Sequence, residues 1–344
     1  MEKLPDPRRY MAFSENPLVV LASRQPAAGI AAQQEICPTA LRDAMAAALR
    51  AGDDGLIEQA LAEAPSQAVR RALAAALGEA GRPPADAGLH WHVFALPVLL
   101  VCGGRAGATV PGVVPDIDAL RAVFDAHGAL GPLKNFALGN AFVSAAGLRP
   151  LLLWRQAHDA GSSPFRPLAL APEPVAIADE RETVHLRFLA GVSVGSAGAP
   201  AFAETAGNIA AWGMPFTREL AAQLSQPGLS LLPIPRPPMS PRQALEAGAF
   251  AQAELGLQLF LSRALRDFRS RVGDPAVHVA ACADATVRIA LSTPFDAGPS
   301  AEYRWPLGPA DDLAAVSRSI LDLLQECRLE QVEVLPEVQP AASH

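Results

Sequence analysis

The pattern closest to a known catalytic signature is Gly191-Val192-Ser193-Val194-Gly195, which fits the GxSxG sequence of a nucleophile elbow. In that elbow a serine sits on a strained turn between a strand and a helix, and only small residues fit beside it. The alternating run before it predicts a strand, as the pattern requires. A histidine base that follows the serine in the chain can only be His278 or the terminal His344. Hydrolysis at Ser193 with His278 as the base is therefore the enzymatic hypothesis.

Three features of the surrounding sequence weigh against this hypothesis. Residues 196–200 contain glycine and proline and do not open a helix directly after the serine. His278 lies in a run that predicts a strand, whereas the base of such a triad is normally carried by a loop. The chain before Ser193 also lacks the repeated strand–helix units on which an elbow is mounted. A function without a catalytic site is therefore the main alternative.

His90 and His92 form the best candidate for a metal site. Residues two apart on a strand face the same side, so both imidazoles could bind one metal ion together with a third ligand. No spacing in the sequence identifies that ligand, and hydrogen-bonded histidines at the start of a strand would give the same pattern. The sequence predicts no cofactor, because the extended run after Gly103 and Gly104 opens no helix and a Walker lysine is missing.

Four cysteines stand far apart and form no CxxC pair: Cys37, Cys102, Cys282 and Cys327. This spacing excludes a local zinc ribbon or thioredoxin motif and is typical of a protein with reduced thiols. The longest apolar run, 89–102, contains two histidines and a proline and is shorter than the ~18–20 residues that span a bilayer. The first residues lack the apolar core of a signal peptide. We therefore expect a soluble, cytoplasmic protein with no membrane partner.

The charge balance disfavours nucleic acid as a partner. The chain has 28 Lys and Arg against 35 Asp and Glu, a net charge of −7, whereas nucleic-acid binding needs a basic footprint. Three basic residues, His278, Arg288 and Arg304, are predicted to share the polar face of a sheet. This group could be an anion site or a solvated sheet face, and the sequence leaves both possibilities open.

Helix signals dominate the first quarter of the chain and recur later. Val19–Leu21 predicts a short strand, and three short helices follow between residues 39 and 80. Further helices are predicted at 116–127, 205–224, 240–272 and 311–328, with mostly helical structure at 130–159. Strands are predicted at 89–102, 174–178, 183–194, 276–283, 286–292, 302–307 and 331–335, the three from 276 to 307 as an antiparallel meander.

These elements predict an α/β or α+β fold. An N-terminal helical cap precedes a mixed α/β lobe, and a C-terminal α+β module with the meander follows. We divide the chain into an irregular segment (1–36), the cap (37–82), the lobe (83–225), a proline-rich connector (226–240), the module (241–336) and a tail (337–344).

No candidate site is specific enough to establish an enzyme. The absence of catalytic motifs, the alanine-rich helical cap and the proline-rich connector favour a non-catalytic protein that binds another protein. It would act as an adaptor, an assembly factor or a subunit of a complex, of the bacterial type that the arginine- and alanine-rich composition suggests. The alternative is a serine hydrolase-like enzyme that uses Ser193. The sequence does not identify a small-molecule ligand.

Overall fold

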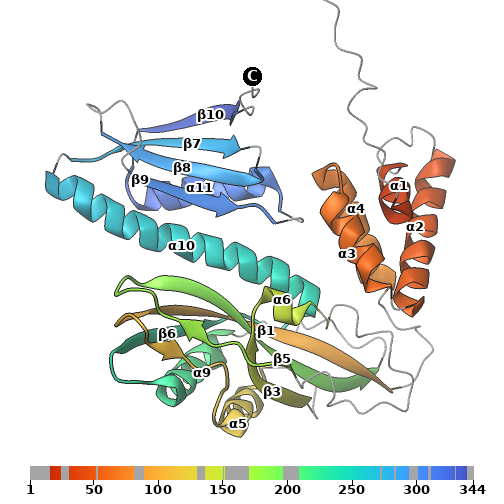
Figure 1. The fold of residues 1–344 in the computed structure, drawn as a ribbon, viewed down its shortest axis with the longest axis horizontal. Coiled ribbons are helices and arrows are strands. Elements are labelled where there is room, and N and C mark those ends of the chain that lie inside the picture. Colours follow the sequence, from red (N-terminus) through yellow and green to blue (C-terminus); the bar gives the residue numbers. More distant parts are fainter. Residues whose placement is uncertain are drawn as a thin grey trace, which may run out of the picture. The chain divides into compact units, whose positions relative to one another are not determined.

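The computed structural model describes most of the chain between residues 16 and 338 (Figure 1). The described residues are 16–24, 31–51, 53–80, 89–129, 136–149, 151, 170–196, 209–271, 273–282, 284–293, 301–308, 311–329 and 331–338. They fall into two compact units, one formed by the helices α1–α4 and the other by the elements from β1 onward. Each unit has its own hydrophobic core.

The first unit consists of helices only: α1 (Pro17–Arg24), α2 (Ala31–Ala51), α3 (Asp54–Glu63) and α4 (Gln67–Ala80). Its core contains fully buried side chains at helical spacing, among them Leu41, Met45 and Leu73. Asp53 caps α3, because its carboxylate accepts a hydrogen bond from the free N–H of Leu56 at 3.1 Å. The three predicted short helices are therefore confirmed.

The prediction of a strand at Val19–Leu21 is wrong, because these residues lie inside α1. The side chain of Asn16 starts this helix by accepting a hydrogen bond from the N–H of Leu18 at 3.0 Å. Leu18 and Ala22, four residues apart, then point into the core of the first unit. The segment expected to be irregular, 1–36, thus contains α1 and the beginning of α2.

The second unit contains two four-stranded sheets. The first has the antiparallel order β3-β5-β1-β6, with β1 (Leu89–Gly104), β3 (Phe136–Val143), β5 (Thr183–Ser196) and β6 (Leu229–Pro235). Residues 93–102 of β1 are all buried, so this strand is covered on both faces. The predictions of strands at 89–102 and at 183–194 are both confirmed.

Two helices cover one face of this sheet: α5 (Ile117–His127) and α9 (Ile209–Leu224). The ring of Phe124 on α5 lies 5.0 Å from that of Trp212 on α9, in an edge-to-face contact. Asp116 caps the start of α5, and Gly128 ends it in the left-handed conformation, as the sequence predicts.

The opposite face of the same sheet packs against α10 (Pro241–Arg271), the longest helix of the unit. Ser240 caps it by accepting a hydrogen bond from the N–H of Gln243. Gly248 lets α10 approach the sheet, because a Cβ there would lie 3.0 Å from a methyl group of Leu186. The second half of α10 turns its leucines, such as Leu257, into the core beneath the other sheet.

The second sheet has the order β10-β7-β8-β9 and packs on α10 and α11 (Leu313–Glu326). Its strands are β7 (Ala276–Cys282), β8 (Thr286–Ser292), β9 (Ala301–Pro306) and β10 (Val332–Val338). The antiparallel meander of β7, β8 and β9 is confirmed, and β10 pairs with β7 in parallel. The mixed α/β or α+β class is therefore confirmed. In Figure 1 the helix α10 runs between the two sheets.

Three predicted elements of this unit differ from the structure. Residues 136–143, predicted to be mostly helical, form strand β3, followed by the short helix α6 (Ala145–Leu148). The segment at 174–178 contributes β4 (Val175–Ala176), which pairs with β2 (Thr109–Val110) and not with β5. The proline-rich stretch contains β6, an edge strand, where a proline can be accommodated because only one side is paired. The division of the chain into segments stays a prediction.

None of the helices in the described ranges is both long and apolar enough to cross a membrane.

Candidate binding groove

Ser193 is a buried residue near the C-terminal end of strand β5, and it does not lie at the tip of a turn. It pairs with His92 of β1 on one side and with Phe136 of β3 on the other. Its side chain is fully buried, and its Oγ has no hydrogen-bond partner among the described residues. A nucleophile must be reachable by its substrate and activated by a base. The geometry at Ser193 offers neither.

His278 lies in the other sheet of the unit, on β7. Its Nδ1 is 3.2 Å from a carboxylate oxygen of Glu333, and its Nε2 is 3.3 Å from the hydroxyl of Ser292. The structure therefore does not bring His278 and Ser193 together into one site.

His90 and His92 both lie on β1, opposite Gly195 and Ser193 of β5. Their side chains are outside the part of the chain that the structure describes. Among the described residues, no group of three or more metal-binding side chains is found. The metal hypothesis therefore rests on His90 and His92 alone, and the described residues supply no third ligand.

The three basic residues His278, Arg288 and Arg304 share the face of the second sheet that points away from its core, as predicted. Arg304 is opposite Arg288 in the register, but it is paired with acids. Its guanidinium is 2.8 Å from Glu302 and 3.1 Å from Asp284. The hydrogen bond from Thr286 and the charge of Arg304 lower the pKa of the Asp284 carboxyl. This face is better described as a solvated network of opposite charges than as an anion site.

On the first sheet Thr183 links His185 to the main chain of Cys102, an arrangement of which the sequence gives no sign. The hydroxyl of Thr183 is 2.8 Å from Nε2 of His185 and donates to the carbonyl of Cys102 at 3.3 Å. Burial raises the pKa of the Cys102 thiol, and burial together with Arg187 lowers the pKa of His185. A protonated, fully buried thiol is a poor nucleophile, so this pair is structural.

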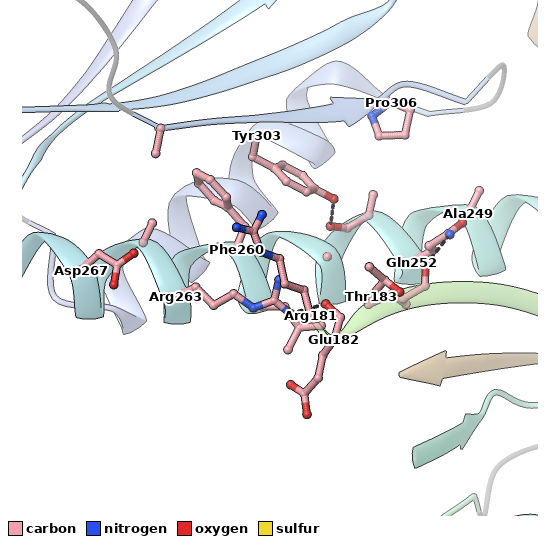
Figure 2. A pocket seen from close by; sticks show the side chains of 16 residues that line it. Arg181, Glu182, Thr183, Ala249, Gln252, Phe260, Arg263, Asp267, Tyr303 and Pro306 are labelled. Atoms are coloured by element: carbon pink, nitrogen blue, oxygen red, sulfur yellow. Dashed lines mark hydrogen bonds between the residues drawn. The ribbon is translucent and has the colours of Figure 1, made fainter. Parts of the chain in front are cut away.

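One feature of the described residues that could hold a ligand is a groove of about 740 Å³ along α10 (Figure 2). The start of β5 forms one wall of the groove and β9 the other. A stripe of α10 between them forms its floor, at helical spacing. The α10 residues that line it are Ala249, Gln252, Ala253, Gly256, Leu259, Phe260, Arg263, Ala264 and Asp267.

Small residues of α10 and two aromatic rings give the groove its apolar centre. The hydroxyl of Tyr303 on β9 donates to the carbonyl of Ala253 at 2.8 Å, and its ring lies 5.7 Å from that of Phe260. A Cβ at Gly256 would be only 2.5 Å from the Tyr303 hydroxyl, so this position leaves no room for a larger residue. Burial raises the pKa of Tyr303 to about 12.

Hydrogen bonds to the main chain of β5 and the turn before it fix the opposite wall. Gln252 donates to the carbonyl of Val184 at 3.0 Å, and Arg263 donates to the carbonyl of Glu182. Arg181 also lines the groove, and its guanidinium has no carboxylate partner among the described residues. The wall is therefore held in place by main-chain contacts, and two guanidinium groups line the groove.

Strand β9 is an edge of its sheet, and the order of its hydrogen bonds shows which groups are free. The N–H of Leu307 donates to the carbonyl of Ala285, its direct opposite in the register of β8 and β9. Hydrogen-bonded pairs alternate with non-bonded pairs in an antiparallel ladder. The main-chain groups of Tyr303 and Trp305 therefore face β8, and those of Glu302 and Arg304 face the free edge. Among the described residues, no strand pairs with this edge.

No protein-family model, no curated protein and no solved structure matches the chain. Its function is therefore argued from the geometry of the described residues.

Sequence reasoning found the elements of the groove but not the groove itself. The long helix at 240–272 and the strand at 302–307, which contains Tyr303, are both predicted. The small residues Ala249 and Gly256 on this helix are a local sign that another chain segment approaches closely.

Proposed function

We propose that this protein is a non-catalytic binding module that captures an extended segment of another protein. The segment lies in the groove over α10 and pairs with the free edge of β9 as a fifth strand. A single observation carries the proposal: the unpaired main chain of β9 borders a groove with an apolar floor. Strand addition of this kind uses main-chain hydrogen bonds for affinity and pockets beneath alternate side chains for specificity.

The free edge offers a definite set of hydrogen-bonding groups. The N–H groups of Glu302 and Arg304 and the carbonyls of Glu302, Arg304 and Pro306 are available to an added strand. At ~3.3 Å per residue, β9 spans roughly 20 Å. Neighbouring strands lie ~4.8 Å apart, so the added strand occupies the space between β9 and the wall at 181–184. Because this wall bounds the groove, a single extended segment fits better than the edge of another sheet.

The proposal is tested by removing one N–H from the edge. In Arg304→Pro the lost N–H is not used by β8, and the proline ring projects toward the added strand. The matched control Arg304→Ala removes the same ion pairs with Glu302 and Asp284 but keeps the N–H. Glu302→Pro is a second variant of the same kind, with Glu302→Ala as its control. Thermal unfolding verifies that every variant is folded.

The probe is a displayed library of random peptides selected on the wild-type protein. A main-chain hydrogen bond contributes ~0.5–1.5 kcal/mol, and the proline ring adds steric exclusion. We therefore expect selected peptides to bind either proline variant at least about tenfold more weakly than wild type. Their affinity for the alanine controls should fall by clearly less. The proposal is overturned if no peptide is selected, or if the selected peptides bind the folded proline variants as well as the alanine controls.

The serine hydrolase alternative has no comparable support. Ser193 is buried without a base within its hydrogen-bonding distance among the described residues. It is therefore not proposed as a second function.

A further inference from the structure

The side chains around the groove indicate the chemistry of the segment that binds there, if the proposed function holds. The apolar centre is formed by small residues on α10 and by the rings of Phe260 and Tyr303. An inward-facing side chain of an added strand would be placed over this centre. Because its surroundings are apolar, a branched aliphatic or aromatic side chain is favoured at this position over a polar one.

Charge is distributed unevenly along the groove. Figure 2 shows Arg181 and Arg263 on the side of Tyr303 away from Pro306, with Asp267 farther along α10 in the same direction. Among the described residues, the Arg263 guanidinium bonds to a main-chain carbonyl and to no carboxylate, and Arg181 has no carboxylate partner. The acids that line the groove, Glu182 and Asp267, form no ion pair with either arginine within 4.0 Å.

We propose that the bound segment carries an acidic side chain that pairs with Arg181 and Arg263. Guanidinium groups form strong, directional hydrogen bonds with carboxylates, and two of them beside an apolar floor are complementary to one carboxylate. The side chain of a helical residue leans toward the N-terminus of its helix. The Arg263 guanidinium therefore reaches back from its Cα toward the apolar centre.

This geometry sets the spacing of the motif. Residues on the same face of a strand are two positions apart, or ~6.6 Å. The segment therefore has a bulky apolar residue beside the ring of Phe260 and an Asp or Glu two positions away, with both side chains facing α10. The residue between them faces the same side as Glu302 and Arg304, where either charge can be accommodated. The partner is thus an extended protein segment with an apolar residue and an acidic residue two positions apart.

The experiment uses a peptide from the library selection and two derivatives in which its groove-facing acid is replaced. One derivative has Asn or Gln at that position and the other has Lys. All three are titrated against the full-length wild type and the variant Arg181→Glu. Arg181 is chosen because its side chain forms no hydrogen bond or ion pair among the described residues. Arg266→Glu is the matched control, because Arg266 is an exposed arginine on α10, near Arg263, that does not line the groove.

We expect Arg181→Glu to weaken the binding of the acidic peptide by about tenfold or more, since a charge-assisted hydrogen bond is lost and a like charge takes its place. The neutral derivative should bind wild type and variant nearly equally, and the Lys derivative should prefer the variant. Arg266→Glu should change the affinity of the acidic peptide by less than about threefold.

The possible failures are distinguishable. If the peptides remain sensitive to Arg304→Pro but are indifferent to Arg181→Glu, the acidic partner is wrong and strand addition stands. If the selected peptides have no acidic residue at the groove-facing position, the acidic partner is again wrong and strand addition stands. If sensitivity to Arg304→Pro is absent, strand addition itself is overturned.

Discussion

Replacing Ser193 with alanine should stabilise this protein, and the expected size follows from the burial of the hydroxyl. The side chain of Ser193 is fully buried, and its Oγ has no hydrogen-bond partner among the described residues. A buried hydroxyl without a partner costs ~1–3 kcal/mol. Alanine removes this cost. The variant also loses the dispersion contacts of one oxygen atom, and this loss offsets part of the gain in stability. We therefore expect the free energy of unfolding to rise by about 1 kcal/mol.

The assay is chemical and thermal unfolding of Ser193→Ala beside a control in which a bonded hydroxyl is removed. In wild type the hydroxyl of Thr217 on α9 donates to the carbonyl of Pro233 at 2.9 Å. Thr217→Val keeps the shape and loses this bond, so it should destabilise by ~0.5–1.5 kcal/mol. For a unit of this size, 1 kcal/mol corresponds to ~2–4 °C in melting temperature. The two variants should therefore shift the melting temperature in opposite directions.

A loss of stability of 1 kcal/mol or more in Ser193→Ala would refute this reasoning, because it would show that the hydroxyl has a partner. The same variant also addresses the hydrolase alternative. Because Ser193 is buried within β5, any ester turnover by the preparation should be unchanged in the variant. Turnover that depends on Ser193 would instead show that the strand opens to expose a nucleophile.

Two further predictions concern the groove wall and the first sheet. Because burial raises the pKa of Tyr303 to about 12 from an unfolded value near 10, its contribution to stability is present below pH 10 and is lost between pH 10 and 12. Ultraviolet titration of wild type should show a late tyrosine phase that Tyr303→Phe lacks, and a phase at pH 10 would contradict the burial. In the sheet, a Cβ at Gly191 would lie 2.1 Å from the ring of the buried Phe94. Gly191→Ala should therefore lower the unfolding free energy by ~1–3 kcal/mol, measured in denaturant. Gly213→Ala in helix α9, whose Cβ would meet only a flexible Ile209 side chain at 3.2 Å, should not destabilise, and equal losses in both variants would refute the packing argument.

Local signals in the sequence were sufficient for the elements that end in definite caps. Asp116 and Gly128 delimit α5, and Ser240 starts α10, because capping depends only on neighbouring residues. Alternating side chains likewise identified β5 and the meander. These features are local, so a single sequence is enough to predict them.

Elements that depend on distant partners were not predictable in this way. Strand β3 (Phe136–Val143) has no uniform alternation, and its pairing with β5 shifts register between Leu138 and Phe142. The proline-rich stretch forms β6 because β1 provides the pairing partner, more than 120 residues earlier in the chain. Local propensity is readily overridden by such tertiary contacts.

The candidate groove was beyond sequence reasoning for the same reason. Its lining comes from three parts of the chain, at 181–184, 249–267 and 301–306. Nothing in the sequence indicates that Arg181, Arg263 and Tyr303 lie around one space. The GxSxG pattern shows that a catalytic motif can also mislead. Its residues have the right composition, but pairing with β1 and β3 places them in the interior of a sheet.

The most direct measurement of the central claim is residue-resolved amide hydrogen exchange along β9, with and without a selected peptide. In the free protein the amides of Glu302 and Arg304 should exchange rapidly, and those of Tyr303 and Trp305, which face β8, should be protected. Bound peptide should slow the exchange of Glu302 and Arg304 and leave the alternation with β8 in place. Protection of Glu302 and Arg304 in the free monomer, or exchange at these two amides that saturating peptide does not change, would contradict strand addition at this edge.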